Sequence, residues 1–265
     1  MFDIFQYEFM RRAFVIGVIL AVILPCIGLT VLLKRLSMMG DTLSHSSLAG
    51  VAIGLALGIH PLLGSIAACI IAGLSIEIIR DKLKAYQEIS AVIILAASIG
   101  LAGIFTSFTN NSNAISSYLF GSIVTIGDQE YYLVIAISIA VLIIYRLIYD
   151  RLYLIVFDPI SAPLLSINVK AIQFVFTFLT AVAISLSAKT IGSLIVSSLL
   201  VIPVICAMQL TKTYRSTLFV SIGLSLIYTI GGLFVSYTFN LKPGSVIVLT
   251  AVAGLIVSMV LKRNK

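Results

Sequence analysis

The sequence predicts an all-α membrane protein, a polytopic helical bundle with about nine transmembrane helices. Hydrophobic residues make up 60% of the 265 residues, charged residues make up 10%, and the mean hydropathy is +1.18. A soluble domain carries roughly 25% charged residues, so this chain has too few charges to cover a surface exposed to water. Long apolar runs separated by short connections complete the pattern and indicate lipid as the main solvent.

Nine apolar runs are long enough to serve as membrane spans, since a helix needs roughly 20 residues to cross about 30 Å of hydrocarbon. The expected spans are 13–33, 42–58, 61–79, 90–108, 131–149, 171–188, 191–210, 216–238 and 245–261. Several runs are short, so a count of eight or ten stays open. The run 114–127 is too short to span and fits a re-entrant or interfacial helix. We expect one transmembrane domain over residues 1–265.

The basic residues predict the orientation of these spans. If the N-terminus lies outside and the C-terminus lies in the cytoplasm, 13 of the 17 lysines and arginines fall on the cytoplasmic side. Cytoplasmic loops of membrane proteins are enriched in these residues. The net charge of +7 is therefore read as a topological signal. Nucleic-acid binding is not expected, because the basic residues form no patch.

Several functions lack their sequence motifs. The chain contains no G-x-x-x-x-G-K-[ST] loop to hold ATP phosphates, no H-E-x-x-H zinc site and no G-x-S-x-G nucleophile turn. If the protein pumps a solute, the energy must come from a partner subunit or from an ion gradient.

Asp41 and His45 are the most informative polar pair, because they lie four residues apart near the start of an expected membrane helix. Residues at this spacing share one helix face. A carboxylate and an imidazole on one face can hold a divalent cation such as zinc, manganese or iron. The alternative is that Asp41 caps the helix and His45 makes one hydrogen bond to another helix. Two ligands alone would leave a metal site incomplete.

Two further polar groups lie at the ends of the next expected span. His60 precedes Pro61 in the outer turn and is a possible ligand on the outer side, although a plain loop histidine has the same pattern. Glu77 lies three residues before Arg80, a spacing that favours an ion pair within one helix near the cytoplasmic surface.

Two connections have features of interaction sites. The polar stretch 109–130 lies outside in this topology and could receive a delivered substrate or be a plain loop. The segment 157–169 lies inside, and its Asp158-Pro159 pair is typical of a helix start. A short helix there could press on a soluble partner or simply join two spans.

Five segments stand out along this polytopic chain, which has no ATPase motif. They are Y-E-F-M-R-R-A-F at 7–14, R-L-S-M-M-G-D-T-L-S-H-S-S-L-A-G-V-A at 35–52, Y-L-F-G-S-I at 118–123, Y-L-I-V-F-D at 153–158 and G-S-L-I-V-S-S-L-L-V-I-P at 192–203. Together, and in this order, they resemble the permease subunits of zinc and manganese uptake ABC transporters, the ABC-3 family with ZnuB- and AdcB-like members. The first two look more like the zinc members.

The resemblance implies a permease of the vitamin-B12-importer type (type II ABC importer) in a bacterial cytoplasmic membrane. It implies a homodimer, two separate cytoplasmic ATPase subunits, a metal-binding protein outside, and a divalent metal as cargo, with no resident cofactor. Asp41 and His45 match the family's G-D-x-L-S-H motif and become candidates for transient metal contact. The segment 157–169 becomes the element that couples to the ATPase, through the residues Asp158, Pro159, Ala162 and Ser166.

One departure from the family's pattern affects this coupling segment, because Ser166 stands where the family usually has glycine.

Two other functions compete with the importer. A secondary carrier driven by protons or sodium would need no ATPase partner. A membrane-embedded zinc hydrolase would need more ligands than the two histidines of the chain supply.

Overall fold

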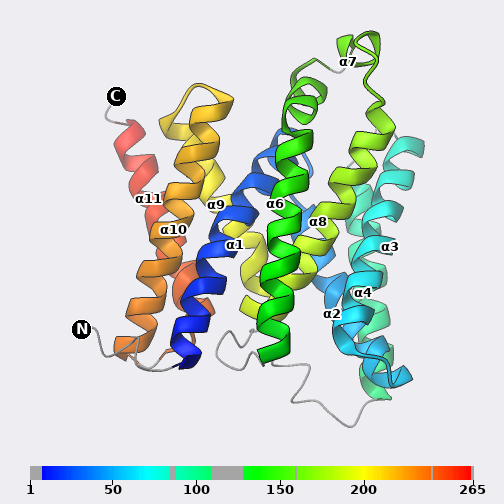
Figure 1. The fold of residues 1–265 in the computed structure, drawn as a ribbon, viewed down its shortest axis with the longest axis vertical. Coiled ribbons are helices and arrows are strands. Elements are labelled where there is room, and N and C mark those ends of the chain that lie inside the picture. Colours follow the sequence, from blue (N-terminus) through cyan, green and yellow to red (C-terminus); the bar gives the residue numbers. More distant parts are fainter. Residues whose placement is uncertain (1–7, 84–87, 109–127, 159, 240, 264–265) are drawn as a thin grey trace. The chain divides into compact units, whose positions relative to one another are not determined.

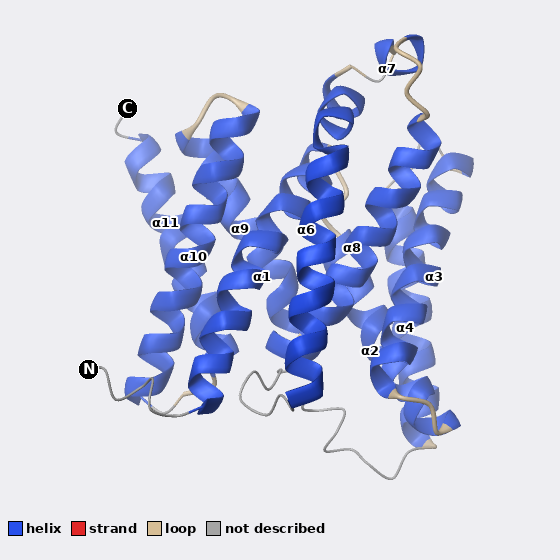
Figure 2. Cartoon of the chain, viewed as in Figure 1, coloured by secondary structure: helices blue, strands red, loops and turns tan. Residues whose placement is uncertain are grey.

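The computed structural model describes residues 8–83, 88–108, 128–158, 160–239 and 241–263, and helices are the only regular elements in these ranges (Figure 2). The helices are α1 (Glu8–Leu33), α2 (Met39–Leu57), α3 (Pro61–Lys82), α4 (Ile89–Ser107), α6 (Asp128–Phe157), α7 (Ser161–Leu164), α8 (Val169–Ile191), α9 (Ser193–Leu210), α10 (Tyr214–Phe239) and α11 (Pro243–Arg263). The predicted all-α fold is confirmed.

Seven helices in the described ranges are long and apolar enough to cross a membrane, which makes the chain a multi-pass membrane protein. They are Met10–Leu33, Pro61–Lys82, Ile89–Ser107, Tyr131–Phe157, Val169–Ile191, Tyr214–Phe239 and Pro243–Val260. α2 is outside this group, and the apolar part of α9 is the shorter helix Ile195–Leu210. The count of nine spans therefore stays a prediction, as do the orientation and the single domain. The expected short helix at 114–127 and most of the connection 109–130 lie outside the described residues.

The contacts of the backbone divide the chain into two compact units. The first unit combines residues 1–29, 116–136 and 187–265, and the second combines 30–115 and 137–186. Each unit is thus assembled from segments that are far apart in the sequence.

In the first unit, α9, α10 and α11 pack on one another and lie side by side in Figure 1. Most of α1, up to Leu29, belongs to the same unit, and the Phe14 ring meets Phe234 of α10 edge to face with the centroids 5.3 Å apart. Edge-to-face contacts of this kind add to the packing that holds membrane helices together.

In the second unit, α2 packs against both α3 and α4. α2 ends at Gly58, which adopts a left-handed conformation with φ of 69°, and its backbone bonds back to Gly54 and Leu55. Pro61 then opens α3 at the position where a missing N–H costs nothing. This tight turn returns the chain antiparallel to α2 and fixes which faces of the two helices meet.

Candidate functional site

α2 carries both residues of the predicted metal pair. The helix begins at Met39 and Met38 occupies the N-cap position, so the alternative that placed Asp41 at the cap is wrong about the position. Asp41 lies in the first turn, where the helix dipole favours a negative charge. His45 follows one turn later, and both side chains are half-buried.

One face of α2 is bonded to α4. The Thr42 hydroxyl donates to the carbonyl oxygen of Ala91 at 3.1 Å, and the hydroxyls of Ser46 and Ser98 are 2.7 Å apart. All of these groups are buried, so each bond satisfies a polar group that has no access to water.

A second face of α2 is bonded to α3. The hydroxyls of Ser47 and Ser65 are 2.7 Å apart, and Ser65 lies at the same distance from Ser185 of α8. Gly50 and Gly64 let the two backbones approach so closely that a Cβ atom at Gly50 would collide with the backbone of Gly64. Small residues of this kind set close helix packing in lipid.

Asp41 and His45 occupy the remaining face of α2. A helix turns by about 100° per residue, so positions 41 and 45 point away from the pair 42 and 46 and from the pair 43 and 47. The structure therefore confirms that the two side chains share a face, and it shows that this face is distinct from those packed on α3 and α4. No group of three or more histidine, cysteine, aspartate or glutamate side chains comes together among the described residues. Any metal held here would need water or ligands from elsewhere.

His60 does not join this pair. It is exposed and precedes α3, whereas Asp41 lies in the first turn of α2. The 19 residues of α2 are about 28 Å long, and they separate the two positions. The predicted role of His60 as an outer ligand stays a prediction.

The predicted coupling segment folds into a short turn of helix, α7. The backbone N–H of Ser161 donates to the Asp158 carboxylate at 3.1 Å, whereas the N-cap position of α7 itself is Ile160. The hydrogen bonds from Ser161 lower the pKa of the Asp158 carboxyl. Pro159, the other half of the predicted start signal, lies outside the described residues.

Ala162 anchors this segment and Ser166 ends it. Ala162 is fully buried, and its carbonyl accepts from the N–H of Ile167 at 3.3 Å. Ser166 has a φ of 59°, the left-handed conformation that glycine adopts without strain. The neighbouring Ile160 and Leu164 are each 81% exposed, so the turn presents apolar side chains outward.

A charged cluster next to α2 was only partly predicted. The expected ion pair is present, with Arg80 4.0 Å from Glu77, and Thr177 of α8 donates to the same carboxylate at 3.2 Å. The Lys34 ammonium lies 5.3 Å from the centre of the Phe176 ring. Burial, followed by the Arg80 charge and partly offset by Glu77, lowers the pKa of Lys34 to about 8. No sequence pattern indicated that Thr177 and Phe176 of α8 would take part.

The model of the family described as "ABC 3 transport family" matches residues 6–262 of the chain. The chain belongs to this family. As an ABC 3 permease it is a transporter subunit and not an enzyme, which agrees with the absence of an ATP-binding motif from its sequence.

Two relatives and one solved structure are similar to this ABC 3 permease over nearly the whole chain. The "Probable metal transport system membrane protein" of Treponema pallidum (strain Nichols) is 34% identical over 258 residues, 97% of each chain. The "Manganese transport system membrane protein MntC" of Listeria monocytogenes is 30% identical over 247 residues, 93% of this chain and 88% of that protein. The structure of PsaBC from Streptococcus pneumoniae in complex with Fab matches with a TM-score of 0.85 at 23% identity, covering 96% of this chain and 91% of that one, which shows the shared fold.

Proposed function

We propose that this ABC 3 permease forms the membrane pathway of an importer for a divalent metal ion, with manganese as the cargo. The observation that carries the proposal is the family match over residues 6–262 together with relatives named for metal transport. The sequence motifs favoured zinc, but the relatives from Listeria monocytogenes and Streptococcus parasanguinis carry manganese in their names. We therefore place manganese first and zinc second.

We assign transient contact with the ion to Asp41 and His45. Their face of α2 is distinct from the faces that bond to α3 and α4, and a carboxylate with an imidazole suits manganese as well as zinc. An incomplete ligand set fits a pathway, because binding must be weak enough for the ion to leave.

The partners in this proposal are those that the family resemblance implies, and the missing ATP-binding motif supports the separate ATPase subunits among them. A homodimer of the permease would work with two cytoplasmic ATPase subunits, and a metal-binding protein would deliver the ion from outside. The α7 turn is our candidate for the ATPase contact, because the exposed side chains of Ile160 and Leu164 project from it. The hydrogen bond from the Ser161 N–H to the Asp158 carboxylate stabilises the turn. This arrangement requires the N-terminus outside and the C-terminus in the cytoplasm, as the basic residues predict.

Uptake of radioactive manganese and zinc by cells that produce the whole complex tests the proposal. We expect Asp41→Ala and His45→Ala to reduce manganese uptake at least several-fold, while Asp150→Ala, an exposed carboxylate on α6, keeps the wild-type rate. Surface abundance of each variant is measured in parallel. Wild-type uptake and selectivity in both α2 variants would remove the pair from the pathway, and wild-type uptake without the ATPase subunits would refute the importer itself.

A further inference from the structure

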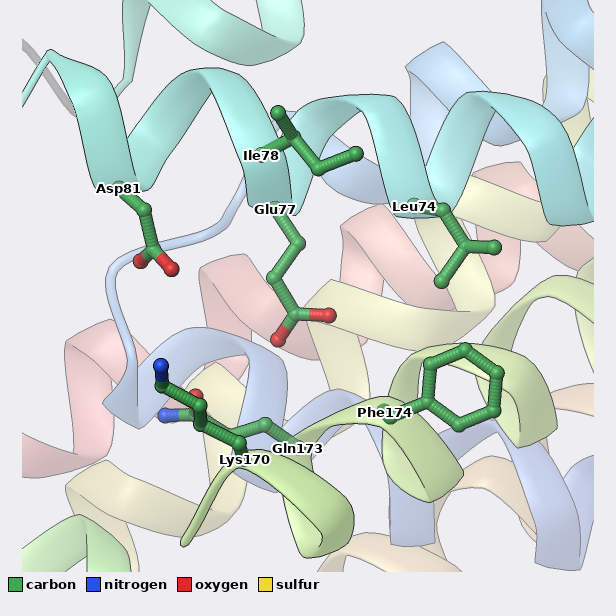
Figure 3. A pocket seen from close by; sticks show the side chains of 7 residues that line it. All are labelled: Leu74, Glu77, Ile78, Asp81, Lys170, Gln173 and Phe174. Atoms are coloured by element: carbon green, nitrogen blue, oxygen red, sulfur yellow. The ribbon is translucent and has the colours of Figure 1, made fainter.

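A pocket of about 300 Å³ lies between the last turns of α3 and the first turns of α8, within the second unit. Leu74, Ile78 and Phe174 form its apolar part, and Glu77, Asp81, Lys170 and Gln173 form its polar part (Figure 3). The sites proposed above for the ion and for the ATPase do not include this pocket.

The charges in the pocket are only partly satisfied by the protein. Glu77 already accepts from Thr177 and pairs with Arg80. Asp81 and Lys170 point toward each other across the opening in Figure 3, yet no ion pair within 4.0 Å joins them in the described parts of the chain. The pocket therefore presents an exposed carboxylate and an exposed ammonium group that no ion pair joins.

The pocket lies where we expect the boundary between lipid and water. Both helices are membrane spans, and the pocket lies at the end of one and the start of the other. Ile71, Ile78 and Phe174 are 66%, 59% and 50% exposed along the same side, so an apolar surface leads away from the charged end. A molecule bound here would have a polar end at the interface and an apolar end in the membrane.

We propose that this pocket binds a phospholipid with a primary ammonium headgroup, of the phosphatidylethanolamine class. The Lys170 ammonium and the Gln173 amide donate to the phosphate, and the lipid ammonium donates to the Asp81 carboxylate. The start of an acyl chain lies against Ile78 and Phe174.

The mixed charges select this headgroup over others. A lipid with a phosphate and no cation leaves Asp81 facing a negative group. A choline headgroup carries the positive charge but has no N–H to donate to the carboxylate. The site does not depend on which ion the permease carries.

Lipid retention by the purified complex tests the proposal. The complex is equilibrated with mixed micelles that hold equal amounts of phosphatidylethanolamine, phosphatidylcholine and phosphatidylglycerol, and bound lipid is quantified by native mass spectrometry. We expect phosphatidylethanolamine to be enriched, and Asp81→Asn or Lys170→Gln to weaken its binding by about fivefold, as expected for the loss of one partly exposed charged contact. The matched controls are Asp150→Asn and Arg146→Gln, which change an exposed pair on α6 and should bind the lipid as the wild type does.

A second measurement separates lipid binding from misfolding. Added phosphatidylethanolamine should raise the melting temperature of the wild type and of both controls, and it should raise that of Asp81→Asn much less. Equal retention of the three lipids, or retention unaffected by the two pocket variants, would overturn the proposal and would favour a protein side chain as the occupant. Binding of soluble phosphoethanolamine as tight as that of the lipid would overturn the role of the apolar wall.

Discussion

Replacement of Gly50 by alanine is expected to destabilise the second unit, because α2 and α3 meet there backbone to backbone. A Cβ atom at position 50 would lie 2.6 Å from the Cβ of Ala68 and 2.7 Å from the carbonyl carbon of Gly64. Carbon atoms prefer separations near 3.5–4.0 Å, so the helices must move apart by about 1 Å. This shift also stretches the 2.7 Å hydrogen bond between Ser47 and Ser65.

The opposing contributions give the expected size of the effect. Overpacking costs about 1–3 kcal/mol, the weakened hydrogen bond costs about 1 kcal/mol, and alanine in place of glycine within a helix returns about 1 kcal/mol. We therefore expect Gly50→Ala to lower the free energy of unfolding by about 1–3 kcal/mol. Unfolding of the purified protein in mixed micelles with rising dodecyl sulfate, followed by circular dichroism, measures this change.

Gly100 of α4 provides the matched control. A Cβ atom at Gly100 meets nothing within 4 Å, so Gly100→Ala keeps only the helix-forming gain and should stabilise by up to about 1 kcal/mol. The reasoning is refuted if Gly50→Ala proves as stable as Gly100→Ala, because α2 and α3 would then not be in the close contact described.

Three further substitutions probe other parts of the second unit. The Lys34 pKa is about 8 in the folded chain against 10.5 ordinarily, so the unfolded chain binds more protons between these values and the free energy of unfolding should rise with pH across that window. Lys34→Met should flatten this rise in the free energy of unfolding, measured by micelle unfolding between about pH 8 and 10.5. Ser166→Gly should relieve about 1 kcal/mol of left-handed strain, seen as a higher melting temperature, whereas Ser166→Ala should not. Ser65→Ala should lower the free energy of unfolding in micelles by about 1–3 kcal/mol, since Ser47 and Ser185 lose their shared partner. An unchanged stability would contradict this hydroxyl chain, the hydrogen bonds from Ser47 through Ser65 to Ser185.

The span positions could be read from the sequence because lipid imposes a simple requirement of length and apolarity. The expected span 61–79 corresponds to Pro61–Lys82, and 216–238 corresponds to Tyr214–Phe239. The largest difference is at 131–149, which the structure extends to Phe157. The helix continues past position 149, and Arg146 and Asp150 lie one turn apart on it with a 4.0 Å contact between their side chains.

The candidate site was predictable only where its residues are neighbours in the sequence. Asp41 and His45 share a face because of their spacing alone. The bond between Thr177 and Glu77 joins residues 100 positions apart, and hydropathy carries no trace of such a pairing. For the same reason the pocket between α3 and α8 was not expected, although the ion pair of Glu77 with Arg80 was predicted from their spacing.

The hydroxyl chain gives the proposed coupling a physical route. Only four residues separate the end of α7 at Leu164 from the start of α8 at Val169, so a force on α7 would be passed to α8 over a short connection. Ser185 of α8 bonds Ser65 of α3, which bonds Ser47 of α2 on the helix that carries Asp41 and His45. The glycine contact prevents α2 from sliding freely on α3, so a displacement of α8 that keeps these bonds must carry both helices together. Under the proposed function, the ion ligands would therefore respond to the ATPase through rigid movement of a helix group, and not through local rearrangement of α2.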